Sequence, residues 1–158
     1  MKQPLIVREY ISYYNGIQHS SVVVTNNGEV LYCPNNNLLD VGIIHNQPKD
    51  SWWPSFMKNS TLVGNVRFTD LWYMMDFVFS CECMKKDKIE LGERIGATWP
   101  MGTELLSILK GNDMRLICEK GDWEQLPTDK CAREFVERVD NILREYTYLG
   151  RWKIEKKT

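Results

Sequence analysis

Residues 71–83 alternate in a way that constrains the fold of this chain more than any other segment. Every second residue of this stretch is apolar: Leu71, Tyr73, Met75, Phe77, Phe79, Cys81 and Cys83. Side chains of an extended chain point alternately to opposite faces, so a period of two places one continuous apolar row against a core. A helix would distribute Asp76 and Glu82 among those apolar groups, where an unpartnered carboxylate is costly. The sequence therefore predicts a long, half-buried strand over residues 71–83.

The composition indicates one globular domain spanning residues 1–158. Hydrophobic residues make up 43% of the chain and charged residues 26%, which are typical values for globular proteins. A net charge of −1 argues against a partner held mainly by bulk electrostatics, so neither nucleic acid nor an anionic membrane is an expected partner. No apolar run is long enough to span a bilayer.

The cysteines and the start of the chain both favour a cytoplasmic protein. Arg8 and Glu9 interrupt the apolar run that a signal peptide would need. The number of cysteines is odd and most lie in apolar segments, which favours reduced thiols used as small core residues. Cys81 and Cys83 are one residue apart, whereas paired zinc ligands are typically separated by at least two. We therefore expect core thiols there, with no metal site and no cofactor.

The first third of the chain reads as a three-stranded meander. Residues 5–14 and 17–25 flank Asn15-Gly16, and Asn27-Gly28 separates the second strand from residues 29–33. Asn-Gly supplies the positive φ angles of a tight hairpin turn, and valines border the second turn on both sides.

The rest of the chain offers several short elements and one long helix. The short elements expected are a strand at 61–68 that pairs with 71–83, a strand at 89–95, a helix at 103–110 ended by Gly111, and a hairpin of residues 114–119 and 123–126. The clearest helix spans residues 128–149, with Thr128 as the expected N-cap and apolar residues at spacings of three and four. This order predicts an α+β fold, in which a mainly antiparallel, twisted sheet carries a long C-terminal amphipathic helix on one face.

An aromatic cluster inside a polar loop is the main candidate for partner binding. Trp52, Trp53 and Phe56 lie within residues 34–60, a stretch that otherwise lacks any sustained period. Tryptophan and tyrosine dominate binding hot spots, so these residues, with Tyr13 and Tyr14, are the predicted partner-binding residues. The alternative is that the loop folds back and closes the open end of the sheet.

Asp76 and Trp72 are the predicted ligand-binding residues. In the expected strand, Met74 and Val78 flank Asp76 on its own face, which would place a carboxylate in an apolar setting. A few polar groups in an apolar pocket are what fixes the orientation of a small ligand. We expect that pocket between the sheet and the helix at 128–149, with Trp72 in its lining.

The sequence carries no catalytic signature. His19 and His45 are the only histidines, and His19 is expected roughly across the first hairpin from Ser12. No nucleophile elbow and no glycine-rich phosphate-binding loop accompanies them. A hydrolase or nuclease that uses His19 stays open as an alternative, but no catalytic residue is assigned.

These features favour a non-enzymatic interaction protein. We expect it to bind and to inhibit or neutralise another macromolecule, in the manner of immunity proteins, antitoxins and viral anti-defence proteins, and the expected partner is a protein. The alternative is a small-molecule or nucleotide-binding domain. The sequence predicts no oligomeric state.

Overall fold

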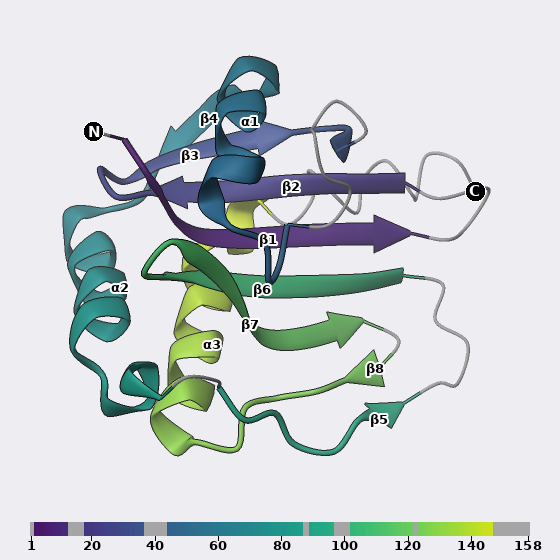
Figure 1. Ribbon diagram of the computed structural model, residues 1–158, viewed down its shortest axis with the longest axis vertical. Helices are drawn as coiled ribbons and strands as arrows, with labels where there is room; N and C mark the ends of the chain where they lie inside the picture. The colour runs from purple at the N-terminus through teal and green to yellow at the C-terminus, as the bar shows by residue number, and fades with distance from the viewer. Residues whose placement is uncertain are drawn as a thin grey trace.

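A six-stranded antiparallel sheet forms the centre of the protein (Figure 1). A computed structural model describes residues 2–12, 18–36, 44–86, 89–96, 102–121 and 123–146. The strand order is β4-β3-β2-β1-β6-β7. The strands are β1 (Pro4–Ser12), β2 (Gln18–Thr25), β3 (Glu29–Cys33), β4 (Thr61–Asn65), β6 (Gly102–Lys110) and β7 (Asp113–Gly121). The predicted α+β class with a mainly antiparallel sheet is therefore confirmed.

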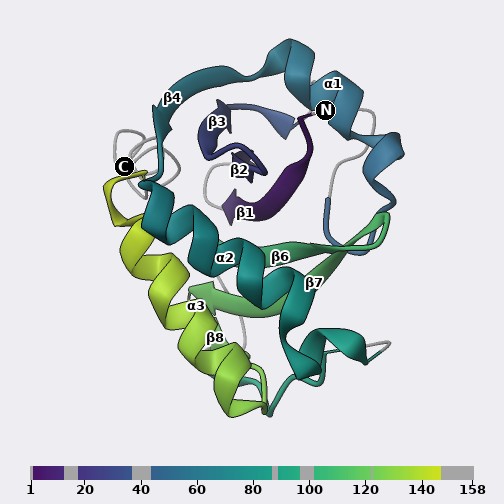
Figure 2. The same ribbon diagram turned by 90° about the vertical axis from the view of Figure 1, so that its left-hand side faces the viewer.

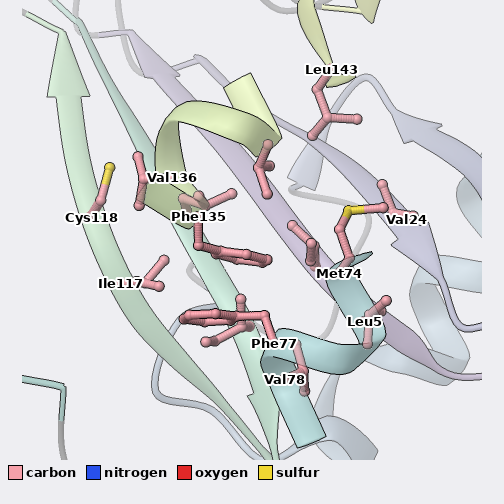
Figure 3. Close-up of a cluster of buried hydrophobic side chains, with 14 of the residues drawn as sticks. Leu5, Val24, Met74, Phe77, Val78, Ile117, Cys118, Phe135, Val136 and Leu143 are labelled. Carbon is pink, nitrogen blue, oxygen red and sulfur yellow. The ribbon is translucent and has the colours of Figure 1, made fainter. Parts of the chain in front are cut away.

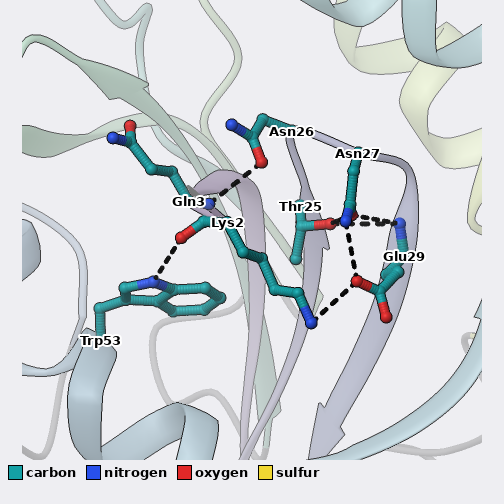
Figure 4. A network of polar contacts seen from close by, with 7 residues as sticks. All are labelled: Lys2, Gln3, Thr25, Asn26, Asn27, Glu29 and Trp53. Atoms are coloured by element: carbon teal, nitrogen blue, oxygen red, sulfur yellow. Dashed lines mark hydrogen bonds and ion pairs between the residues drawn. The ribbon is translucent and has the colours of Figure 1, made fainter.

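The predicted meander is confirmed in β1, β2 and β3. β2 pairs with β1 on one side and with β3 on the other, both antiparallel. At the second turn the Glu29 N–H donates to the Thr25 hydroxyl over 3.1 Å, and the Asn27 side chain bonds to both Thr25 and Glu29 (Figure 4). The first predicted turn, Asn15-Gly16, lies outside the described residues.

Residues 103–110 form a strand, so the helix predicted there is wrong. β6 lies between β1 and β7 and pairs with both. Its side chains from Thr103 to Leu109 are all buried, because both faces of the sheet are covered at this point. A strand buried on both faces lacks the alternation of a half-buried one and is easily mistaken for a short helix. Gly111, predicted as a helix end, instead provides the positive φ of 63° in the turn between β6 and β7.

The segment expected as the long strand is largely a helix, α2 (Phe68–Ser80), so that prediction is wrong. Its buried residues, Asp70, Met74, Phe77 and Val78, recur at helical spacing. Asp76 lies on the exposed side, and the helix ends before Glu82, so neither carboxylate is forced into the core. Apolar residues stand at even as well as odd positions of residues 71–83. The same sequence therefore fits both a period of two and the helical period of 3.6.

The last helix is shorter than predicted. α3 spans Lys130–Ile142, thirteen residues rather than the expected 128–149. Its N-cap is Asp129, whose carboxylate accepts a hydrogen bond from the Ala132 N–H over 3.0 Å, and not Thr128. A 3-10 turn, η4 (Arg144–Tyr146), follows the helix.

α2 and α3 cover one face of the sheet together. Figure 2 shows the two helices side by side in front of the strands, with α1 (Trp53–Asn59) at another corner of the molecule. Phe77 of α2 stacks on Phe135 of α3 with 3.9 Å between ring centroids. Figure 3 shows these rings among strand side chains that include Val24 and Ile117. This layer forms the larger of two hydrophobic cores, and the second lies on the opposite face beneath α1.

Three smaller predictions need correction. β4 covers only part of 61–68 and pairs with β3 rather than with 71–83. The strand expected at 89–95 is reduced to β5 (Ile95–Gly96), which pairs with β8 (Trp123–Glu124) in a separate two-stranded sheet. β7 has β6 as its main partner and meets the segment after β8 only at the bridge between Glu119 and Gln125, so the predicted last hairpin forms only in part.

An ionic network joins the sheet to α3. The Asp140 carboxylate on α3 accepts hydrogen bonds from Arg8 of β1 and from Lys120 of β7. Arg8 is buried, and a hydrogen bond to an ionised partner is stronger than one between neutral groups. Burial alone would lower the pKa of Lys120, but the hydrogen bond and the charge of Asp140 raise it overall.

η4 lies directly over the edge strand β4. A Cβ atom added at Gly64 would collide with the Tyr146 ring and hydroxyl, so only glycine permits this approach. Tyr146 is buried in this position and belongs to the larger core. The chain after α3 is thereby fixed against the edge of the sheet.

Two phenylalanines of α2 distinguish the helix from the predicted strand. Phe77→Ala should lower the free energy of unfolding by about 3 kcal/mol, because it removes a buried ring that stacks on Phe135. Phe79→Ala should change it by less than about 0.5 kcal/mol, because Phe79 is exposed. Chemical unfolding followed by circular dichroism measures both values. Similar losses in the two variants would indicate a strand, in which Phe77 and Phe79 share a face.

Candidate functional site

Three aromatic side chains lie exposed along one side of α2. Phe68 is 77% exposed, and Trp72 and Phe79 are each 66% exposed. The three residues are spaced by four and seven positions, so they follow one line along the helix, away from the line that carries Met74 and Phe77. We call Phe68, Trp72 and Phe79 the α2 aromatic face. An exposed row of large apolar side chains is typical of an interaction site.

Trp72 and Asp76, the predicted ligand-binding residues, lie one turn apart on the outer side of α2. Both face solvent rather than the space between the sheet and α3, which buried side chains such as Phe77 and Phe135 fill. Asp76 makes no hydrogen bond or ion pair with any residue in the described part of the chain. It therefore borders the α2 aromatic face as an unpaired carboxylate, and its role in binding stays a prediction.

Trp52, Trp53 and Phe56 lie inside the molecule. All three are buried in the second core, where the Trp53 and Phe56 rings stack with 5.6 Å between centroids. The Trp53 indole N–H donates to the Lys2 carbonyl oxygen over 3.2 Å (Figure 4). The loop thus folds back onto the sheet, which is the alternative that the sequence left open. These side chains present no surface to a partner, so the structure gives the partner-binding prediction no support at these three positions.

Tyr13 and Tyr14, the other predicted partner-binding residues, lie outside the described residues. Their part in binding stays a prediction.

A buried carboxylate brings together the only two histidines of the chain. Glu9 of β1 is fully buried, with Oε1 lying 3.0 Å from His19 Nε2 and Oε2 lying 3.5 Å from His45 Nδ1. The backbone N–H groups of Ile44 and His45 donate to the same carboxylate over 2.7 and 3.2 Å. Glu9 therefore holds the segment that leads to α1 against the centre of the sheet.

Electrostatics keep Glu9 ionised despite its burial. Desolvation alone would raise the pKa of Glu9. Hydrogen bonds with His19 and His45, the charge of His19 and the Ile44 N–H together outweigh it, so the pKa of Glu9 lies below its ordinary value.

A carboxylate that orients a histidine is half of a common catalytic arrangement, but this cluster lacks a nucleophile. Neither histidine contacts a serine, threonine or cysteine side chain among the described residues. His19 lies opposite Ile11 rather than Ser12, so Ser12 points to the other face of the sheet and the expected pair with His19 does not form. The cluster is best explained as an anchor for the chain.

Sequence reasoning missed the importance of Glu9, although a signal was present. Val7, Glu9 and Ile11 are two residues apart, so in a strand Glu9 lies on the same face as these two apolar residues. That face is buried. A charged residue in that register needs partners, and the two histidines are side chains that provide them.

A cavity of about 530 Å³ opens beside β7. Asn46, Ile89, Glu90, Leu91, Arg115, Leu116 and Gln125 line it. Among the described residues, the Arg115 Nε is buried without a hydrogen-bond partner, and its guanidinium forms one ion pair, with Asp113 at 3.6 Å. A guanidinium with an unsatisfied Nε at the wall of a cavity is suited to binding a carboxylate or a phosphate.

We find no metal centre in the described part of the chain. No group of three or more histidine, cysteine, aspartate or glutamate side chains there has an arrangement that could hold a metal ion.

Comparison with protein-family models gives no match for this sequence, and no curated protein is similar enough in sequence to count as a relative. Within the described ranges, no helix is both long and apolar enough to cross a membrane.

Replacing Glu9 tests the anchor. Glu9→Gln should lower the free energy of unfolding by about 2 kcal/mol at neutral pH, because a neutral amide cannot form charge-assisted hydrogen bonds. Its NH₂ group would also face a backbone N–H, so that two donors meet without an acceptor. A lowered folded-state pKa gives stability above the ordinary carboxyl pKa, and this stability is lost as pH falls through the lowered value. The difference between the two proteins should therefore shrink in acid.

Chemical unfolding at neutral and acidic pH measures this difference. Glu137→Gln is the matched control, because Glu137 is exposed on α3 and its replacement should change stability by less than about 0.5 kcal/mol. A loss in Glu9→Gln that stays constant with pH would contradict the role of the Glu9 charge.

Proposed function

We propose that this protein is a non-enzymatic interaction protein that binds another protein through the α2 aromatic face and thereby inhibits or neutralises it. The observation that carries the proposal is the row of three exposed aromatic side chains on one side of a helix whose other side is buried. A helix needs only its inner side for folding, so the aromatic residues on the outer side have no role in the core.

The size of these side chains supports the proposal. A large aromatic side chain buries roughly 150–250 Å² when fully covered, at about 25 cal/mol per Å² of apolar area. Covering the exposed parts of Phe68, Trp72 and Phe79 would contribute on the order of 10 kcal/mol before the cost of association is subtracted. That contribution is comparable with the whole free energy of a tight complex.

The unpaired carboxylate beside the aromatic residues indicates the chemistry of the partner. Asp76 lies one turn from Trp72, and oppositely charged groups across an interface favour correct docking. We infer that the partner offers an apolar surface with a lysine or arginine at its rim.

Affinity capture with variants of the α2 aromatic face tests the proposal. Proteins that the wild-type chain enriches from cells of its source organism should be lost with the triple variant Phe68→Ala, Trp72→Ala, Phe79→Ala. Quantitative mass spectrometry measures the loss. Once a partner is identified, Trp72→Ala alone should weaken its affinity by about 30-fold, or about 2 kcal/mol.

Ile95→Ala is the matched control, because Ile95 is also largely exposed but lies on β5. It should retain the same proteins. Circular dichroism checks that each variant is folded. A folded triple variant that still enriches every protein captured by the wild type would refute the proposal.

The cavity beside Arg115 favours a small-molecule binding protein as a second candidate. Its volume of about 530 Å³ lies in the range of ligand sites, and its lining combines the apolar Ile89, Leu91 and Leu116 with four polar residues. The Arg115 guanidinium would bind an anionic group of the ligand.

Thermal unfolding against a panel of carboxylates and phosphate esters tests this candidate. A ligand at a hundred times its dissociation constant should stabilise the wild type by about 2.7 kcal/mol. Arg115→Leu should abolish that shift. Arg133→Leu, which removes an exposed arginine on α3, should leave it unchanged. A panel without any stabilising compound would exclude this second candidate for the classes tested.

A further inference from the structure

Two thiols meet directly after the C-terminal end of α2. Cys81 is the C-cap of the helix, and its N–H donates to the Phe77 carbonyl oxygen over 3.1 Å. Cys83 follows in a 3-10 turn, η3 (Glu82–Lys85). The two Sγ atoms lie 3.2 Å apart, which is within contact distance of one another. The side chains therefore converge although only one residue separates them in the chain.

We propose that Cys81 and Cys83 are a thiol–disulfide exchange site, which low-molecular-weight disulfides oxidise reversibly to an intramolecular disulfide. A disulfide bond is about 2 Å long, so the sulfur atoms need to approach by only about 1 Å. The inference rests on the geometry of this turn and is independent of the proposed binding function.

The two thiols differ in access to solvent, which sets the order of the reaction. Cys81 is partly buried but keeps some access to solvent, whereas Cys83 is buried against Met84 and the larger core. Burial, followed by the hydrogen bond and the charge interaction with Cys81, raises the pKa of Cys83 to about 12. Cys83 is therefore protonated at neutral pH, and Cys81 is the more accessible thiol of the two, which a reagent from solution meets first.

The reaction balances with a small disulfide, such as glutathione disulfide, as the oxidant. The Cys81 thiolate attacks one sulfur of glutathione disulfide, which gives a mixed disulfide at Cys81 and releases one glutathione thiolate. The Cys83 thiol then gives up its proton and attacks the Cys81 Sγ, which forms the intramolecular bond, breaks the mixed disulfide and releases the second glutathione thiolate. The two protons lost by the protein thiols end, through solvent, on the two released glutathione thiolates. The two protein thiols are oxidised by two electrons, and one glutathione disulfide is reduced to two thiols.

The other cysteines of the chain are placed differently. Cys33 and Cys118 are buried on strands of the sheet, on opposite faces. Cys131 is exposed on α3 and lies close enough to the pair for electrostatic interactions with it, but neither Cys81 nor Cys83 makes a hydrogen bond with Cys131. A reagent could therefore also react at Cys131, and the experiment has to distinguish that product.

Oxidation of the purified full-length chain in buffers of defined glutathione to glutathione disulfide ratio tests the proposal. After acid quenching and alkylation, intact mass and peptide mapping should reveal the loss of two hydrogen atoms, with Cys81 and Cys83 both protected from alkylation. Reduction with dithiothreitol should restore both thiols. The Cys131→Ser variant should behave like the wild type.

Serine variants of the pair make the assignment specific. Cys81→Ser should lose oxidation at this site, and Cys83→Ser should accumulate a glutathione adduct at Cys81 that cannot resolve. Circular dichroism checks that both variants are folded. Two thiols that remain free in fully oxidised glutathione, a stable adduct at Cys81 in the wild type, or an adduct at Cys131 alone would each overturn the proposal.

Discussion

Two adjacent buried charges in the central strand hold the layers of this protein together. Arg8 and Glu9 follow one another in β1, so their side chains leave opposite faces of the sheet. Arg8 bonds to Asp140 and thereby fixes α3 on one face, whereas Glu9 binds the segment at Ile44 and His45 on the other. Hydrophobic burial supplies most of the driving force, but these contacts determine where each layer attaches. In the sequence, the same two residues indicate only that the first apolar run is too short for a signal peptide.

The meander could be predicted because its signals are local. The Asn27-Gly28 turn and the valines beside it determine register without help from the rest of the chain. The segments at 71–83 and 103–110 were misassigned for the opposite reason. Their structures depend on what covers them: β6 is buried on both faces, and α2 is covered by α3 on only one side. Tertiary contacts of this kind leave no periodic signal that distinguishes a strand from a helix over so short a run.

Because residues 71–83 were assigned to a strand, the α2 aromatic face could not be predicted from the sequence. Trp72 and Phe79 would point to opposite faces of a strand, and only helical geometry brings them into line with Phe68. The loop tryptophans have the size and the polar surroundings that are typical of binding residues, yet their side chains fill the second core. Composition alone could not separate these uses, since a tryptophan that closes a core and one that meets a partner look alike in a sequence. The two histidines lay far apart in the chain, and only the fold of the sheet brings both to Glu9.

The contact between Gly64 and Tyr146 has a consequence for the behaviour of the protein at high concentration. β4 is the last strand of the sheet on its side, and an apolar surface left uncovered on such a strand promotes association between chains. Tyr146 covers this strand from the face of the sheet, and the absence of a side chain at Gly64 is what lets it sit there. Any larger residue at that position would lift the tyrosine away. The result would be a folded molecule with an uncovered apolar surface on its last strand, through which chains associate without unfolding.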